Sequence, residues 1–442
     1  MASGAGFTMA LIAQGGLGRN LEIAQRALAL IGAVVIASCS SAGTANPSPS
    51  EAAWPMYRGD LERDGHPTGA TLDVAGALRL SLAWRAHLDG AVDGTPAVAG
   101  GLVFAGSANG ELGGFNSQTG ATVWLRRGLG AISDSPAVDR DRVFVGTLTG
   151  HVRALRAADG NPLWDWKGPA NAAFWASPVV FRDLVLVGVA SPYGDQPLVP
   201  GRLVGLDAET GRERWNTCLL PRCQAGDGLW STPAIDAYGV GFVGVGNPDD
   251  AVLAFDALTG ARKWLTTLYP DRERDLDVGA SPVVFTLNGR EVAAQAGVEG
   301  TFALLDAATG ERVWSRKLVE GSAVHGLIAS PAFDGTALYV ASASPPNGLL
   351  ALSPTDGMVA WRHATGRPVY SAPAAGNGVV VFGTGAVFGD LTSGSLIALA
   401  TTDGRELWKY DTHSAVRSGP AIAGGLVLAG DYSGDVLAFR TS

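Results

Sequence analysis

The stretch LDAETGRERW, residues 206–215, decides the fold because variants of it recur along the chain. Each copy has an apolar start, a turn built on Thr-Gly or Asp-Gly, and a tryptophan at its end. Seven copies are complete, and LRLSLAW at residues 78–84 matches only the final half of an eighth. The terminal tryptophans are spaced by 40 to 51 residues, and they are Trp84, Trp124, Trp164, Trp215, Trp264, Trp314, Trp361 and Trp408.

A second element lies between successive copies, where a small residue and a proline open an apolar strand. These prolines are Pro96, Pro136, Pro178, Pro233, Pro282, Pro331, Pro373 and Pro420. Together the two elements predict four short antiparallel strands per repeat, which is the period of a β-propeller blade. The turn glycine supplies a positive φ, and the flat tryptophan suits the gap between neighbouring blades. We therefore expect the eight tryptophans to be structural docking residues.

The two ends of the repeat region predict how the ring closes. The last copy stops after DVLAFRTS, three strands into its blade, whereas the first copy begins with a lone fourth strand. The N-terminal strand should complete the C-terminal blade, which would remove an exposed sheet edge. The sequence predicts an all-β chain with an eight-bladed propeller of four-stranded antiparallel blades over residues 78–442.

The N-terminal residues indicate export. The apolar run at residues 27–38 is too short to span a bilayer comfortably, and IASC, ending at Cys39, resembles the lipobox of bacterial lipoproteins. The resemblance implies a lipoprotein-type signal peptide over residues 1–38 and lipid on Cys39; the alternative is an ordinary signal peptide with an incidental cysteine. Residues 39–53 are expected to be a flexible tether, and residues 54–77 a lead-in to the propeller.

The net charge of the chain and its expected export limit the classes of partner that it can bind. The net charge of -9 argues against nucleic acid, which needs a basic surface. We expect a monomer that reaches the membrane through its lipid anchor, either outside the cytoplasmic membrane or in the periplasm and cell envelope.

The only cysteines in the body of the chain lie in WNTCLLPRCQAGDGLW, residues 215–230. Four residues separate Cys218 from Cys223, which is neither the C-x-x-C redox spacing nor half of a zinc site. In an exported protein the pair is expected to form a disulfide. We expect this disulfide to hold its loop and so to position Trp230.

The long insertions of the repeat all fall in loops on one face of the predicted propeller. They are residues 191–201, 216–229, 266–279 and 385–394. Variable loops on a rigid scaffold commonly carry binding residues, so the functional surface is placed on this loop-rich face.

The residue three before each repeat proline should lie at the channel mouth on that face. Reading around the ring gives Asp93, Ser133, Trp175, Trp230, Gly279, Ile328, Tyr370 and Arg417, with Asp134 one step further in. The candidate ligand site is Asp93, Asp134, Trp175, Trp230, Tyr370 and Arg417. The aromatic and arginine side chains suit a flat or anionic ligand by stacking and charge pairing. The alternative is a plug of side chains that closes the channel without a ligand.

The repeat resembles the tryptophan-docking repeat of the quinoprotein, or PQQ-binding-like, β-propellers. WPMYRGDLERDG at residues 54–65 is also similar to a lead-in of such proteins. The family includes dehydrogenases that use pyrroloquinoline quinone (PQQ) and non-enzymatic outer-membrane assembly lipoproteins of the BamB type. For the enzymes the resemblance implies PQQ against a tryptophan, with Ca²⁺ bound by carboxylates. The candidate loop carboxylates here are Asp227, Asp275, Asp277 and Glu299.

Several expected enzymatic features are missing from the sequence. There is no Cys-Cys pair, no C-x-x-C-H haem site and no recognisable carboxylate–Asn–Asp ligand spacing. The six histidines are scattered, so no metal site and no catalytic residue is assigned. The preferred interpretation is a binding or scaffold protein of the cell envelope that meets an envelope protein or a small ligand at its loop-rich face. The alternative is a PQQ-dependent dehydrogenase, with Ca²⁺, that oxidises alcohols or sugars.

Overall fold

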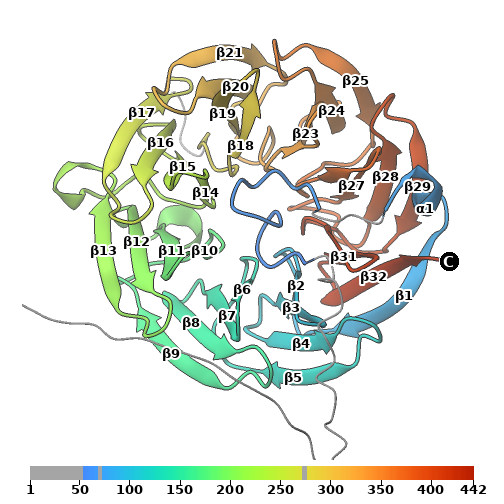
Figure 1. The fold of residues 1–442 in the computed structure, drawn as a ribbon, viewed down its shortest axis with the longest axis horizontal. Helices are drawn as coiled ribbons and strands as arrows, with labels where there is room; N and C mark the ends of the chain where they lie inside the picture. Colours follow the sequence, from blue (N-terminus) through green and yellow to red (C-terminus); the bar gives the residue numbers. More distant parts are fainter. Residues whose placement is uncertain (1–52, 68–71, 271–275) are drawn as a thin grey trace, which may run out of the picture. The chain divides into compact units, whose positions relative to one another are not determined.

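The computed structural model describes residues 53–67, 72–270 and 276–442, and its regular structure is almost entirely β-strand. Eight four-stranded antiparallel sheets form the blades of a propeller ring (Figure 1), which confirms the predicted fold class. The signal peptide, Cys39, the tether as far as residue 52, and Asp275 lie outside the described residues. None of the described helices is long and apolar enough to cross a bilayer.

The strands follow the chain blade by blade, from the channel outward. The first blade comprises β2 (Ala97–Ala99), β3 (Leu102–Gly106), β4 (Leu112–Asn116) and β5 (Thr122–Arg126). The second comprises β6 (Ala137–Asp139), β7 (Arg142–Gly146), β8 (His151–Arg156) and β9 (Pro162–Lys167). The third comprises β10 (Val179–Phe181), β11 (Leu184–Val189), β12 (Arg202–Asp207) and β13 (Glu213–Cys218). The fourth comprises β14 (Ala234–Ile235), β15 (Val240–Val245), β16 (Ala251–Asp256) and β17 (Arg262–Thr267).

The remaining blades repeat this order. The fifth comprises β18 (Val283–Leu287), β19 (Arg290–Ala296), β20 (Thr301–Asp306) and β21 (Arg312–Lys317). The sixth comprises β22 (Ala332–Phe333), β23 (Leu338–Ser342), β24 (Gly348–Leu352) and β25 (Val359–Ala364). The seventh comprises β26 (Ala374–Gly376), β27 (Val379–Thr384), β28 (Ser395–Ala400) and β29 (Glu406–Asp411). The eighth comprises β30 (Ala421–Ala423), β31 (Leu426–Gly430), β32 (Asp435–Thr441) and β1 (Leu80–His87). Short helical turns are α1 (Val74–Ala77), η1 (Tyr193–Asp195) and η2 (Pro221–Cys223).

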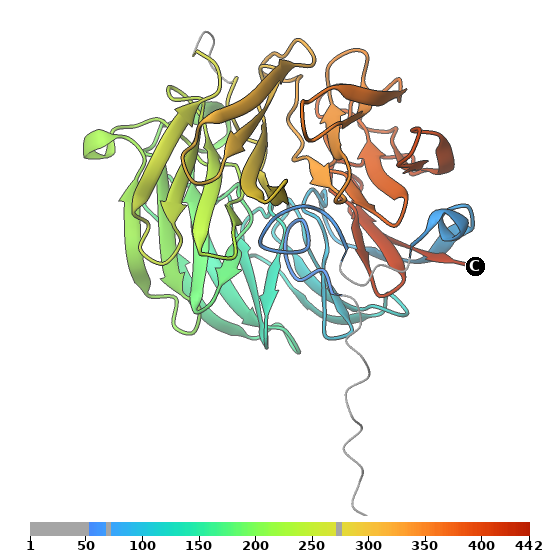
Figure 2. The ribbon, with the colours of Figure 1, turned by 45° about the horizontal axis from the view of Figure 1, so that its top comes forward.

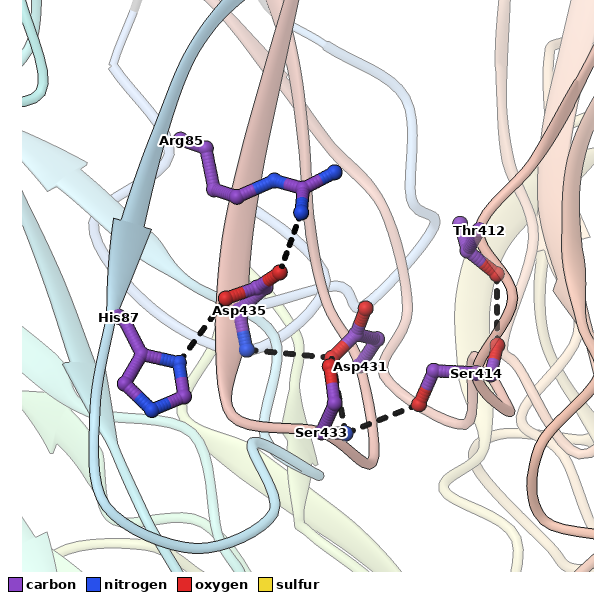
Figure 3. Close-up of polar contacts among 7 residues, drawn as sticks. All are labelled: Arg85, His87, Thr412, Ser414, Asp431, Ser433 and Asp435. Atoms are coloured by element: carbon purple, nitrogen blue, oxygen red, sulfur yellow. Dashed lines mark hydrogen bonds and ion pairs between the residues drawn. The ribbon is translucent and has the colours of Figure 1, made fainter.

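The ring closes as predicted, because β1 supplies the fourth strand of the blade formed by the C-terminal end of the chain. β1 pairs antiparallel with β32, from Leu80 opposite Thr441 to His87 opposite Asp435. Asp435 also joins the two strands through its side chain, which lies 3.0 Å from Arg85 Nη1 and 2.9 Å from His87 Nδ1 (Figure 3). Backbone pairing and these two polar contacts therefore fix the seam of the ring.

The repeated tryptophans dock each blade onto the next. Trp264, for example, donates its indole N–H to the carbonyl of Ala307 in the following blade, at 3.0 Å. A Cβ atom on Gly310, the turn glycine of that blade, would lie 2.7 Å from the Trp264 ring, so the ring packs directly against the glycine. Trp408 packs against no such turn glycine among the described residues, because the two outer strands of the next blade, β32 and β1, come from opposite ends of the propeller and are not joined by a turn. It packs edge-on against Phe439 of β32 instead, with ring centroids 5.0 Å apart.

The first part of the lead-in, residues 54–67, occupies the centre of the ring, whereas α1 lies at its outer edge beside β29 (Figures 1 and 2). Its backbone carbonyls accept hydrogen bonds from the inner strands of six blades. The donors are the N–H groups of Val98, Val138, Ile235, Val284, Phe333 and Ala375, each two residues after a repeat proline. The lead-in therefore ties the blades together from inside.

Two arginines of the lead-in are fully buried and bind the inner ends of the blades. Arg58 donates to the carbonyls of Pro331 and Pro373, and Arg63 donates to the carbonyl of Pro233. Burial lowers the pKa of both guanidinium groups, and the hydrogen bonds to the carbonyls replace those that the charged groups would make to water. The channel is thus closed on the side of the short turns by the lead-in, a role that the repeat pattern did not reveal.

Candidate functional site

A cavity of about 150 Å³ lies at the channel mouth on the loop-rich face. It is lined by all eight residues that stand three before a repeat proline, and by Asp134. The structure thus brings the six candidate ligand-site residues together around one cavity. The lead-in contacts residues that follow the prolines, so it lies deeper in the channel, where Tyr57 forms part of the cavity floor. The channel-mouth side chains therefore surround a cavity, and whether that cavity takes a ligand stays a prediction.

Asp93 and Arg417 form an ion pair across the first and eighth blades. Arg417 Nε and Nη2 lie 2.8 and 2.6 Å from Asp93 Oδ1. The guanidinium also lies over the ring of Tyr432, 4.7 Å from its centroid. Arg417 was expected to attract an anionic ligand, but its charge is already compensated by Asp93.

The polar atoms of the three aromatic side chains that line the cavity are hydrogen-bonded to other groups of the protein. Trp175 donates its indole N–H to the Ser191 carbonyl at 2.9 Å, and Tyr370 donates its hydroxyl to the Val324 carbonyl. Trp230 donates its indole N–H to Asp277 Oδ2 at 3.0 Å. These residues consequently offer a ligand their ring surfaces and not their hydrogen-bonding atoms.

Trp230 is positioned by the fifth blade. Its ring packs against Gly279, where a Cβ atom would lie 1.8 Å from the nearest ring carbon. Cys218 and Cys223 do form a disulfide. The ring itself contacts Asp277 and Gly279. That the disulfide positions Trp230 by holding the preceding loop stays a prediction.

A chain of hydroxyl groups runs around the inside of the cavity. In five successive steps, the backbone N–H of the residue before a repeat proline donates to the side-chain oxygen of the equivalent residue in the next blade, at 2.8–3.0 Å. The residues are Thr95, Ser135, Ser177, Thr232, Ser281 and Ser330. This series of hydrogen bonds stops at the seventh and eighth blades, where the equivalent residues, Ala372 and Gly419, have no hydroxyl group. Thr95 Oγ1 is buried and has no partner among the described residues.

Asp134 stands at a repeat position that carries serine in three other blades. Ser231, Ser371 and Ser418 each accept a hydrogen bond from a glycine N–H of their own second strand, at 2.8–3.0 Å. Asp134 Oδ2 accepts the equivalent bond from Gly146 at 2.7 Å. The serine side chains have only one oxygen, so the second carboxylate oxygen of Asp134, Oδ1, is not needed for this structural hydrogen bond.

That additional oxygen is buried and has no partner in the described part of the chain. The Asp134 residue is 2% exposed, and burial raises the pKa of its carboxyl well above the usual range. A buried acceptor without a partner is costly in a protein interior, so it is a candidate functional group. The serine pattern at this position was visible in the sequence and would have singled out Asp134.

The candidate loop carboxylates are not brought together as a metal site. Asp277 is committed to Trp230 and to the backbone N–H of Asn247, and Glu299 pairs with Lys317. Asp227 is buried beside Asp249, and desolvation with that neighbouring charge raises its pKa to about 8. In the residues that the structure covers, no group of three or more His, Cys, Asp or Glu side chains is placed to hold a metal ion.

Comparison with known proteins agrees with the geometry of the ring. The family model described as outer membrane protein assembly factor BamB matches residues 81–269, 224–330 and 298–442. Polyvinylalcohol dehydrogenase of Sphingopyxis sp. (strain 113P3) is 26% identical over 73% of this chain, and the chain spans 60% of that relative's length.

Two solved structures show the same fold. Quinohemoprotein alcohol dehydrogenase from Comamonas testosteroni superposes with a TM-score of 0.74 at 18% identity, covering 88% of this chain and 80% of the other. BamB from Moraxella catarrhalis superposes with a TM-score of 0.61 at 19% identity, covering 82% and 97%. With the family match across almost the whole ring, the chain belongs to the PQQ-binding-like β-propeller family that includes outer membrane protein assembly factor BamB.

Proposed function

We propose that this protein is a binding propeller of the cell envelope that works through its loop-rich face, and that it is not a dehydrogenase. The observation that carries the proposal is the pairing of Arg417 with Asp93. Arg417 is the only cation among the described residues that line the cavity, and its charge is already balanced. The site therefore has no free positive charge to offer an anionic cofactor.

PQQ fits these residues poorly. It is a planar, tricyclic tricarboxylic acid, so it needs several cationic or N–H donors as well as space. The cavity volume of about 150 Å³ lies below the range of about 300–1,000 Å³ that is typical of cofactor and drug-sized ligand sites. Asp134 would add a further acidic group beside such a ligand. The dispersed loop carboxylates also give no shared set of oxygen ligands for Ca²⁺.

A PQQ-dependent dehydrogenase acting on alcohols or sugars is the second candidate. It is supported by the similarity to polyvinylalcohol dehydrogenase and by the tryptophans in the cavity wall. A test adds PQQ with Ca²⁺ to residues 53–442 and records the melting temperature and dye reduction with alcohols and sugars. A melting shift with dye reduction would replace our proposal with this one.

The surface of the loop-rich face supports a protein partner. Its insertions carry exposed apolar side chains, including Tyr193 (75% exposed) and Phe388 (54% exposed). Such residues on projecting loops suit contact with another protein. The lipobox-like IASC at residues 36–39 supports an exported protein held at a membrane, where a partner would be another envelope protein.

The partner can be tested by photo-crosslinking in the native envelope. A photoreactive residue replaces Tyr193 or Phe388, and the control replaces Tyr238, which is 83% exposed in a short turn on the opposite face. We expect one defined envelope protein to be crosslinked from positions 193 and 388 but not from position 238. Equal labelling from all three positions would refute a specific loop-rich binding face.

A further inference from the structure

The insertion of the third blade, residues 191–201, carries two exposed apolar side chains of the loop-rich face. They are Tyr193, which is 75% exposed, and Leu198, which is 48% exposed. The insertion lies between β11 and β12, and its one regular element is the short turn η1. Because a loop of this kind has no strand ladder of its own, contacts at its two ends must set its conformation.

Three backbone hydrogen bonds join the second end of the insertion to the cysteine loop, residues 216–229. The N–H of Gly226 donates to the Val199 carbonyl at 3.2 Å, and the N–H of Gly201 donates to the Gly226 carbonyl at 2.9 Å. The N–H of Leu219 donates to the Gly201 carbonyl at 3.0 Å. The two segments also pack closely, since a Cβ atom on Gly201 would lie 2.0 Å from the carbonyl oxygen of Asp227. The cysteine loop therefore supports this end of the insertion.

The first end of the insertion is tied to the second end and to the channel mouth. The N–H of Val199 donates to Ser191 Oγ at 3.1 Å, so the two ends of the insertion hold each other. The Ser191 carbonyl accepts the indole N–H of Trp175 at 2.9 Å. A continuous set of contacts therefore runs from the cysteine loop through the insertion to a wall of the channel-mouth cavity.

The disulfide closes the cysteine loop between the two segments that contact the insertion. Cys218 directly precedes Leu219, and Cys223 precedes Gly226 by three residues. Arg222 and Cys223 both have a left-handed backbone, with φ of 58° and 49°, which residues other than glycine rarely adopt. Such a conformation persists only where its surroundings impose it, so opening the disulfide should let the loop relax.

We propose that the Cys218–Cys223 disulfide positions the third-blade insertion for the protein partner, so that opening it withdraws Tyr193 and Leu198 from the binding face. The proposal rests on the proposed function in taking Tyr193 as a partner contact. The seventh-blade insertion, residues 385–394, contains no cysteine and carries the exposed Phe388. One molecule therefore holds a contact that depends on the disulfide and a contact that does not.

Hydrogen exchange of the purified full-length protein tests the structural part of the proposal without a partner. In the double variant Cys218→Ser/Cys223→Ser, residues 191–201 should exchange at least about tenfold faster than in the wild type, because the loop that supports them opens more readily. Residues 385–394 should exchange at an unchanged rate. Unchanged exchange in residues 191–201 would overturn the proposal.

Photo-crosslinking in the native envelope tests the binding part. The double-serine variant should give several-fold less crosslinking from position 193 and unchanged crosslinking from position 388. Equal yields from position 193 in the variant and the wild type would overturn the proposal, and so would an equal fall at both positions. If the wild type crosslinks no defined protein from either position, the proposed function fails, while hydrogen exchange still decides whether the disulfide holds the insertion.

Two further comparisons do not depend on how the serine variant folds. A dithiol opens the disulfide of the wild type by exchange, leaving two cysteine thiols and becoming a disulfide itself, and it should accelerate exchange in residues 191–201 reversibly. Gly226→Ala keeps both cysteines but places a side chain at a φ of 132°, so it should also accelerate exchange there. Gly228→Ala is the matched control, because its Cβ would meet its nearest atom at 3.5 Å. Wild-type exchange rates in both the reduced protein and Gly226→Ala would refute the supporting role of the cysteine loop.

Discussion

Trp230 and Asp277 are joined by a hydrogen bond from the indole N–H to a carboxylate oxygen, and this bond links the inner loops of the fourth and fifth blades. The ring of Trp230 meanwhile lies against Gly279, two residues after Asp277. One short segment of the fifth blade therefore supplies both the hydrogen-bond acceptor and the packing surface that orient a wall of the cavity.

Replacing Gly279 by alanine should displace Trp230. The new methyl group would lie 1.8 Å from a ring carbon, so the indole must move and its bond to Asp277 should break. We expect a loss of about 1–3 kcal/mol in unfolding free energy, as for overpacked sites, and a shift in tryptophan fluorescence. Gly228→Ala is the matched control, since its Cβ would meet its nearest atom at 3.5 Å. A similar fluorescence change in both variants would contradict the assignment.

The buried arginines of the lead-in should be essential to stability. Arg58→Met removes the donors to the Pro331 and Pro373 carbonyls and leaves these acceptors inside the ring. We expect the free energy of unfolding to fall by about 2–4 kcal/mol, because hydrogen bonds to charged groups contribute about 1.5–3 kcal/mol each. Urea unfolding measures the change, with Arg127→Met, 72% exposed in its side chain, as the control. A loss under about 0.5 kcal/mol, as is usual for surface changes, would show that the lead-in is not a clamp.

Stability should fall as the pH rises from about 6 to 9. Burial raises the pKa of Asp60 to about 7, with Asp64 beside it, and raises that of Glu291 to about 7, with Asp236 beside it. Asp227 follows the same pattern with a pKa of about 8. The folded state holds these protons where the unfolded state has lost them, so their stabilisation is lost as the pH passes through the folded values.

Urea unfolding at pH 6 and pH 9 tests this dependence of the free energy of unfolding on pH. The wild-type protein should be more stable at pH 6, and Asp227→Asn should lose less stability between the two pH values because it removes one of the titrating groups. The carboxyls with lowered pKa values, such as Asp207 and Asp306, are ionised throughout this window and do not contribute to the slope. A free energy of unfolding that rises toward pH 9 would show that these buried carboxyls do not hold their protons in the folded state.

The seam of the ring should depend on Asp435. Asp435→Ala removes the side-chain contacts to Arg85 and His87 that connect β32 with β1 (Figure 3). We expect a loss of about 1–2 kcal/mol in the free energy of unfolding, since the mostly buried carboxylate pairs with Arg85 and also contacts His87. Hydrogen exchange should show faster opening of β1 than of β5, which ends a blade formed from continuous chain. Equal exchange in both strands would show that the seam does not depend on this residue.

The ring could be predicted because its decisive residues repeat. The docking tryptophans and the prolines set the blade count, the phase of each strand and even the eight positions at the channel mouth. Contacts that occur only once in the ring could not be predicted from the repeat. Asp93 meets Arg417 only because the ring closes across 324 residues, and Trp230 finds its acceptor in the next blade. The disulfide was anticipated, but the contacts of the Trp230 indole with Asp277 and Gly279 were not.

The lead-in was the largest omission, since Arg58 and Arg63 lie outside the repeat and charged residues are usually exposed. Its placement also sets an order of events during biosynthesis. The residues from Trp54 to Gly65 complete their contacts only when donors as distant as Ala375 have taken their places. This segment precedes every blade in the sequence, yet it is among the last to dock, and it must stay accessible until seven blades have emerged.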